Sequence, residues 1–425
     1  MNLQKEMDSL PDAIVQYILS HLSNAKDVAA STCVSKQWKD SIPYIKSLYF
    51  PRNLYDNLTG GDTPDNIVNK LLSSTTRLEE LVVYCPFTAA GLASWLSHLW
   101  PSLKLLELRM DNLFEQQSLP DGPSKLNCIR IVNNIESLKL WGVLIVHSPN
   151  WETFHNLRNL EIVGARVEDS ALSDALLACP NLTNLSILAC EGLKSISISL
   201  PSLVNCKLDF YGVGNCSLSL TSPYIESLEV QGCSWIKVLE THCLRNLSIA
   251  NNSGRVYMVD FGKLGALEFL SIRGVQWGWE AVSKMLHMAS EVKDLYMKVE
   301  FTGDYDVLLP FPEIDLVDFF NSHPKLEKFY IHGAMFAALC QKNSLKNVDS
   351  SFMIPSLEEV VITARSPLNA EQKMSTLESL IKYGVNLKKM RIRILDMKSS
   401  HSSADEFFQD VCRFRHFNHN IVSIE

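Results

Sequence analysis

One short spacing of apolar residues recurs through most of the chain and limits the folds that it can adopt. A leucine or another apolar residue is followed three and five residues later by two more, thirteen times in all. The most complete copy consists of Leu182, Leu185, Ile187, Cys190 and Leu193. Because alternate residues of a β-strand point to opposite faces, we expect Leu185 and Ile187 to point inward from a short strand.

A unit this small cannot bury its apolar face alone, but stacked units can, and their strands then pair in parallel. The first positions of successive copies lie 19 to 34 residues apart. They are Leu78, Leu103, Ile135, Leu157, Leu182, Leu203, Ile225, Leu244, Leu267, Val292, Leu326, Leu357 and Leu387. The pattern L-x-x-L-x-L-x-x-N/C-x-L is typical of leucine-rich repeats. The sequence therefore predicts an α/β fold, a curved solenoid of about 13 repeats over residues 77–398 with a parallel concave sheet.

The segments between the predicted strands change along the chain. Helical spacing of apolar residues predicts helices after the early strands and again over 280–288, 314–320 and 371–383. Between Leu193 and Leu264 the connections are short and alternate, as in Ile196, Ile198 and Leu200. This alternation predicts second strands on the convex side of the solenoid.

Composition excludes several classes of protein. With 46% hydrophobic and 20% charged residues the chain is typical of a folded protein, and its net charge of −8 gives no basic footprint for nucleic acid. No apolar run is long enough for a signal peptide or a membrane span, so we expect no membrane association and a cytoplasmic or nuclear protein. The eleven cysteines form no CxxC pair.

Sequence signatures of catalysis and of cofactor binding are lacking. The chain has no GxSxG, GxxxxGK[ST] or HExxH motif, so we expect no enzyme and no cofactor. Cys412, His416 and His419 could share one face of a C-terminal helix, but three candidate ligands without a fourth are weak support for a metal site. We expect residues 399–425 to form a helical cap that seals the last repeat, with an apolar face made by residues such as Phe407 and Val411.

The first 48 residues differ from the repeats, because they contain the apolar spacing of three short helices. So small a unit can barely bury its own core. Its apolar residues could seal the open end of the solenoid, or they could complete their core against another protein. Residues 49–76 are expected to connect this unit to the first repeat and to contain one helix, over 65–73.

The helical unit resembles an F-box. The resemblance rests on Ser9-Leu10-Pro11-Asp12, on Ile14, Ile18, Leu19, Leu22 and Asp27, and on Cys33-Val34-Ser35-Lys36-Gln37-Trp38-Lys39. The F-box followed by leucine-rich repeats is similar to plant F-box/leucine-rich-repeat proteins, in which the F-box binds a Skp-type adaptor and, through it, a cullin. In that family the repeats select the protein to be ubiquitinated. The resemblance implies adaptor-binding or motif-core roles for Leu10, Pro11, Ile14, Ile18, Val34 and Trp38.

A basic surface with interleaved aromatic rings is expected on the C-terminal part of the concave sheet. It comprises Arg273, Tyr296, Lys298, Tyr330, His332, Arg391 and Arg393. Arginine and tyrosine are favoured at interfaces, and a basic surface suits an acidic segment, a phosphorylated peptide or an anionic small-molecule co-ligand. The alternative is a solvated face without a dedicated ligand.

Two functions follow from these patterns. The first is the substrate-recognition subunit of a Skp/cullin/F-box ubiquitin ligase, which binds its unidentified protein substrate through the repeats. The second is a leucine-rich-repeat scaffold or inhibitor that binds one protein and has no ubiquitin role.

Overall fold

A computed structural model describes residues 10–55, 63–100, 102–110, 124–211, 216–301, 312–341, 352–395 and 402–425. Parts of the predicted F-box, connecting segment, solenoid and C-terminal cap lie outside the described residues, namely 1–9, 56–62, 101, 111–123, 212–215, 302–311, 342–351 and 396–401. The chain divides into two compact units, Met1–Leu193 with Leu200–Leu203 and Lys194–Ser199 with Val204–Glu425. Each unit is described by itself.

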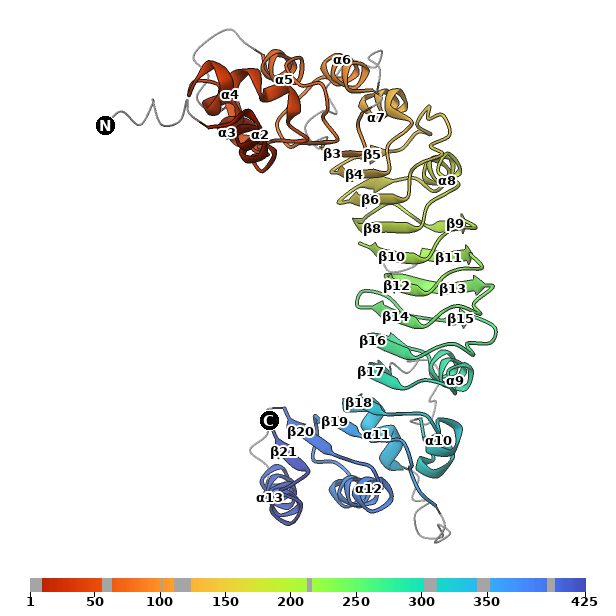
Figure 1. Cartoon of the computed structure of the whole chain (residues 1–425). Coiled ribbons are helices and arrows are strands. Elements are labelled where there is room, and N and C mark those ends of the chain that lie inside the picture. Colours follow the sequence, from red (N-terminus) through yellow and green to blue (C-terminus); the bar gives the residue numbers. More distant parts are fainter. Residues whose placement is uncertain are drawn as a thin grey trace, which may run out of the picture. The chain divides into compact units, whose positions relative to one another are not determined.

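Unit 1 begins with short helices that share one small core (Figure 1). They are α2 (Asp12–Ser20), α3 (Ala25–Ser31), α4 (Lys36–Asp40) and the 3₁₀ turn η1 (Ile42–Tyr44). Pro11 stands directly before α2, at the N-cap, and Asn24 caps α3 by accepting a hydrogen bond from the Lys26 amide. Val15, Leu19, Val28, Trp38 and Ile42 are buried.

The helices pack directly on the sheet of unit 1. The first strand, β1 (Ser47–Phe50), follows η1 at once, and its Tyr49 amide donates a hydrogen bond to the Ser23 carbonyl over 2.7 Å. The parallel strands then follow as β2 (Glu80–Val83), β3 (Leu105–Arg109), β4 (Ser137–Trp141), β6 (Asn159–Val163) and β8 (Asn184–Cys190). The connections hold η2 (Arg52–Tyr55), α5 (Pro64–Leu72), α6 (Ala89–Leu99), α7 (Lys125–Cys128), η4 (Ile129–Val132), α8 (Asp169–Leu177) and the short paired strands β5 (Leu144–Ile145) and β7 (Arg166–Val167).

Unit 2 repeats the same arrangement with longer and more varied connections. Its main sheet runs through β10 (Asn205–Phe210), β12 (Ser227–Gln231), β14 (Asn246–Asn251), β16 (Phe269–Trp277), β17 (Asp294–Phe301), β18 (Lys328–His332), β19 (Glu359–Ala364), β20 (Lys389–Ile394) and β21 (Val422–Ile424). All of its pairings are parallel. The sheet thus has the parallel order that stacked repeats predict.

The layer behind this sheet contains strands first and helices later (Figure 1). A second parallel sheet is formed by β9 (Ser195–Ser199), β11 (Cys216–Thr221), β13 (Cys233–Leu239) and β15 (Met258–Asp260). The helices that follow are α9 (Trp279–Met288), α10 (Leu316–Ser322), α11 (Gly333–Gln341), α12 (Ala370–Tyr383) and α13 (Ser402–Phe417). The change from short second strands to helices is the one that the connection lengths predicted.

Most strands of the main sheets show the alternating burial that the repeat pattern predicts, whereas β19 is buried on both faces. On β8, Leu185 and Ile187 are 1% and 0% exposed, whereas Ser186 between them is half-buried. The buried face packs against the helices and second strands, and we call the opposite face of each main sheet the open face. Its side chains are not needed for the core, so they are available for binding.

Two glycines show how closely successive repeats approach each other. Gly232 has φ +86°, and a Cβ added to it would lie 2.4 Å from the carbonyl oxygen of Phe210 in the preceding repeat. Gly142 has φ +65°, and its added Cβ would lie 2.5 Å from the Met110 carbonyl oxygen. Only glycine fits both the backbone angle and this distance.

Several elements were not predicted from the sequence, among them the short strands β5 and β7 and three elements that extend or pack against the repeat sheet. Strand β1 adds a repeat before Leu78, with Ile45, Leu48 and Phe50 in the apolar positions. Strand β21 pairs with β20 after the predicted C-terminal helix. Helix α11 replaces a predicted connection, and it is apolar on nearly every side because it is enclosed by β17, β18, β19 and α12.

Candidate functional site

The first candidate surface lies on helix α2, which is apolar on two sides. Val15 and Leu19 point into the helical core, whereas Ile14 is 45% and Tyr17 is 65% exposed. Pro11 is also exposed, and Leu10 and Ile18 are half-buried. The spacing of Pro11, Ile14 and Ile18 places them on one side of the helix. We call Leu10, Pro11, Ile14, Tyr17 and Ile18 the α2 surface.

The loop before α4 holds the beginning of α2 in place. The Gln37 side-chain amide donates to the Leu10 carbonyl over 2.6 Å and to the Asp12 carboxylate over 2.8 Å. Gln37 belongs to the Val34-Ser35-Lys36-Gln37-Trp38 run from which the F-box resemblance was drawn. The two parts of that motif are therefore joined by hydrogen bonds, which fix Leu10 and Pro11 on the surface.

The six residues implied by the resemblance occupy different environments. Trp38 is only 6% exposed, so it contributes to the core of the helical unit and not to its surface. Val34 is half-buried at the turn before α4. Tyr17 is not among the six residues implied by the resemblance, yet it is the most exposed large apolar residue of α2. Its position three residues after Ile14 on an amphipathic helix is the signal that could have identified it.

The second candidate surface is the C-terminal part of the open face in unit 2. Strand register places Arg273 beside Lys298 and Tyr296 beside Tyr330. Thr363 of β19 lies between His332 on one side and Arg393 on the other. The seven predicted residues thus come from β16, β17, β18 and β20 of one sheet. Between β18 and β20, β19 contributes the buried Val361 and Thr363 to this face. The rows of basic and aromatic side chains are continuous except at β19.

Carboxylates neutralise part of this basic surface. Arg391 pairs with Glu359 and lies 3.7 Å from a Glu425 carboxylate oxygen, while Arg393 donates to Glu425 over 2.8 Å. The hydrogen bond to Glu359 is the main reason why the pKa of Arg391 is raised. Lys298 is exposed and, among the described residues, has no carboxylate within ion-pair distance.

Arg365, which follows β19, belongs to the same surface and was not predicted. It pairs with Glu300, and both residues line a cavity of about 360 Å³ together with Ala250, Asn252, Arg273, Gly274, Val275 and Lys298. Its position after the end of a strand, outside the alternating pattern, explains why the sequence pattern missed it. We call Arg273, Lys298, His332, Arg365 and Arg393 the basic cluster.

His332 reports the positive potential of the basic cluster. Burial, followed by the charges of Lys298, Arg365 and Arg393, lowers the pKa of this imidazole to about 4. The ring is therefore neutral at pH 7. Of these three cations Arg365 and Arg393 already pair with Glu300 and Glu425, so among the described residues Lys298 is the one left to bind an anion.

Aromatic rings line both open faces. In unit 2 the rings of Tyr296 and Tyr330 are 6.0 Å apart, and His332 lies 5.5 Å from Tyr296. In unit 1 Tyr84 contacts Tyr49 edge-on at 5.4 Å and Trp141 at 6.5 Å, and its hydroxyl donates to Glu107. Burial, with the Glu107 hydrogen bond second, raises the pKa of Tyr84 to about 12. The strand pattern did not identify Tyr49 or Tyr84, because β1 was not predicted and Tyr84 follows the end of β2.

Two other kinds of feature are absent from the described residues. No three histidine, cysteine or acidic side chains in the described ranges are grouped so that they could hold a metal ion. None of the helices in that part of the chain is both long and apolar enough to span a lipid bilayer.

A short helical unit followed by a parallel repeat sheet is the architecture expected of F-box proteins with leucine-rich repeats. The F-box-like family model matches residues 7–50, which end where β1 ends. The F-box protein At1g10780 of Arabidopsis thaliana is 64% identical over 419 residues, covering 99% of this chain and 100% of the relative. The F-box/LRR-repeat protein At1g67190 of the same plant is 22% identical over 320 residues, 71% of this chain and 73% of that protein. The chain belongs to the plant F-box protein family.

Proposed function

We propose that this protein is the substrate-recognition subunit of a Skp/cullin/F-box ubiquitin ligase, acting in the cytoplasm or nucleus. Its F-box binds a Skp-type adaptor, which connects it to a cullin, and its repeats bind the protein to be ubiquitinated. The subunit performs no chemistry itself. It accelerates ubiquitin transfer because it raises the effective concentration of the substrate beside the transferring enzyme.

The observation that carries this proposal is the apolar α2 surface within the F-box match. Ile14 and Tyr17 expose 45% and 65% of their surface, although Val15 and Leu19 of the same helix are buried in the helical core. Exposed apolar side chains at helical spacing are typical of a helix that packs against another protein. A unit that only sealed the end of the repeat sheet would need no apolar residues on this side.

The open face of unit 2 supplies the proposed substrate surface, made by Arg273, Tyr296, Lys298, Tyr330, His332, Arg391 and Arg393. Among the described residues Arg273 and Lys298 have no carboxylate partner, and Arg273 donates only to the Ser248 hydroxyl, over 3.3 Å. A ligand with an anionic group would find these two cations available beside the tyrosine rings. An acidic segment, a phosphorylated segment and an anionic co-ligand share this chemistry.

The test separates the two surfaces. Affinity purification with ubiquitin transfer blocked is carried out on wild type, on Ile14→Asp/Tyr17→Asp and on Arg273→Glu/Lys298→Glu. We expect the first variant to lose the adaptor and keep the substrate, and the second variant to lose the substrate and keep the adaptor. Lys46→Glu/Lys388→Glu is the matched control, since both lysines are well exposed and lie elsewhere.

Two results would contradict the proposal. A wild type that captures no Skp-type adaptor would favour a repeat scaffold without a ubiquitin role. Substrate capture that is equal in the Arg273→Glu/Lys298→Glu variant and the control would remove the basic cluster from recognition.

A further inference from the structure

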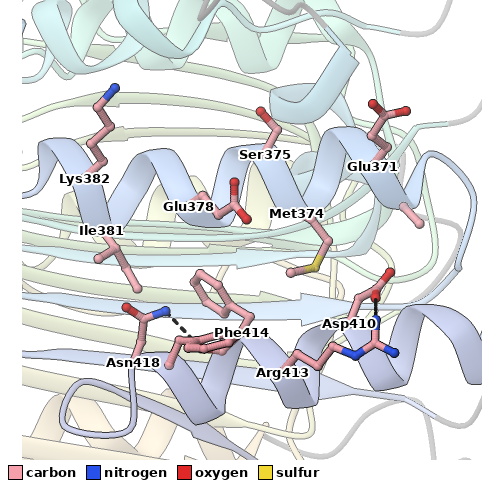
Figure 2. Close-up of a pocket in the computed structure, with 12 residues that line it drawn as sticks. Glu371, Met374, Ser375, Glu378, Ile381, Lys382, Asp410, Arg413, Phe414 and Asn418 are labelled. Carbon is pink, nitrogen blue, oxygen red and sulfur yellow. Dashed lines mark hydrogen bonds and ion pairs between the residues drawn. The ribbon is translucent and has the colours of Figure 1, made fainter.

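A groove between helices α12 and α13 of unit 2 belongs to neither surface described above (Figure 2). It has a volume of about 850 Å³ and lies on the helical side of the sheet. The two helices belong to successive repeats. Neighbouring strands lie about 4.8 Å apart whereas packed helices need about 8–10 Å, so helices of adjacent repeats diverge away from the sheet.

The groove is lined by apolar side chains and by charged ones, the carboxylates of Glu371, Glu378 and Asp410 and the cations of Lys382 and Arg413. In Figure 2, Met374 and Ile381 point from α12 toward α13 with Glu378 between them, and Phe414 points from α13 toward α12. Phe417, one turn beyond Phe414, also lines the groove and is 80% exposed. So exposed a phenylalanine beside a cavity is typical of a binding surface.

The charges of the groove favour a basic ligand. Asp410 and Arg413 pair with each other at 3.2 Å, and the Lys382 ammonium lies 4.9 Å from the ring centre of Tyr383. Glu378 is exposed and, within the part of the chain that the structure describes, has no cation within ion-pair distance. Glu371, which also lines the groove, has none either among the described residues, but Glu378 is the carboxylate that lies between Met374 and Ile381 and can accept a partner's cation there.

The spacing of these residues favours a helical partner. Met374 and Ile381 are seven residues apart, which is two turns or about 10.5 Å along α12. A partner helix that lies in the groove presents its own residues i and i+7 at the same separation, with residue i+3 or i+4 between them. A segment that binds by adding a β-strand would need a free sheet edge, and this groove is bounded by helices.

We propose that the α12/α13 groove binds an amphipathic helix of a partner protein that carries a lysine or arginine between two apolar residues spaced seven apart. The cation pairs with Glu378, and the apolar side chains contact Met374, Ile381, Phe414 and Phe417. This site is independent of adaptor binding through the α2 surface and of the basic cluster.

The test uses a displayed library of helical peptides selected against the purified full chain bound to its adaptor. Selected peptides are expected to carry lysine or arginine between apolar residues at i and i+7. They should bind Glu378→Lys and Phe417→Asp about tenfold or more weakly than wild type, since losing one partly exposed contact of this kind changes affinity by about that factor. Glu406→Lys is the matched control, because Glu406 is exposed on α13 but does not line the groove.

Several results would overturn the proposal. Enrichment of acidic peptides would reverse the inferred charge, and a failure to select any peptide that depends on Phe417 would remove the groove as a helix site. Light scattering gives the remaining outcome: self-association of the wild type that Phe417→Asp abolishes would assign the groove to a second copy of the chain. Circular dichroism of each variant establishes that the fold is retained.

Discussion

Replacing Ile187 with alanine tests the physical basis of the repeat sheet. Ile187 on β8 is 0% exposed and lies beside Ile162 of β6. The substitution removes three buried carbons, which at about 0.8 kcal/mol each gives about 2.4 kcal/mol. If the neighbouring residues do not collapse, the cavity raises the loss of unfolding free energy to about 4 kcal/mol. Ser186→Ala, one residue earlier on the open face, should change the free energy of unfolding by less than about 0.5 kcal/mol.

Urea unfolding followed by far-UV circular dichroism measures both variants. Repeat proteins can unfold in parts. Hydrogen exchange of peptides that cover β6 and β8 therefore shows which strands lose stability. We expect faster exchange in these two strands for Ile187→Ala alone. An equal loss of stability in Ser186→Ala and Ile187→Ala would refute the assignment of the buried and open faces.

Three further predictions follow from individual residues. NMR titration of His332 should give an imidazole pKa near 4, and because the folded pKa lies below the ordinary value of 6.5, stability should fall as the pH drops from about 6.5 to 4. His332→Asn should remove this part of the pH dependence, and inorganic phosphate should raise the His332 pKa if it binds the basic cluster. Gly232→Ala should lower the free energy of unfolding, measured in urea, by more than Gly262→Ala. Both glycines have positive φ, but only a Cβ at Gly232 would meet a backbone carbonyl. Trp38→Ala should destabilise the F-box by about 3–5 kcal/mol, which exchange of the α2 and α4 amides would detect.

The repeat sheet could be predicted because its pattern has a direct physical cause. Each strand must bury two alternate residues, so the apolar spacing of Leu185 and Ile187 and of their counterparts can be recognised in the sequence. Strand β1 has the same pattern in Ile45, Leu48 and Phe50, but it spans the boundary at residue 48 between the predicted helical unit and the predicted connection. Helix α11 gave no amphipathic signal, because an element enclosed on all sides has no polar face.

The candidate surfaces were predictable only in part. Open-face residues such as Tyr296 and Lys298 follow from alternation along a strand, whereas Arg365 and Tyr84 follow strand ends, where alternation stops. The pairing of Arg391 with Glu359 depends on which strands are neighbours, and that information is not local in the sequence. The α12/α13 groove likewise depends on how two helices pack, so no single segment indicates it.

The affinity of the full chain for a purified Skp-type adaptor tests the central claim most directly. Ile14 and Tyr17 still expose 45% and 65% of their surface, so each can contribute about 1 kcal/mol when an adaptor covers it, and a buried aspartate adds a desolvation cost. We predict that wild type binds, that Ile14→Asp/Tyr17→Asp raises Kd about 100-fold or more, and that Tyr44→Asp, which alters another exposed aromatic residue of the same unit, changes it little. Equal affinity of wild type and the α2 variant, or a wild type that binds no Skp-type adaptor, would contradict the account.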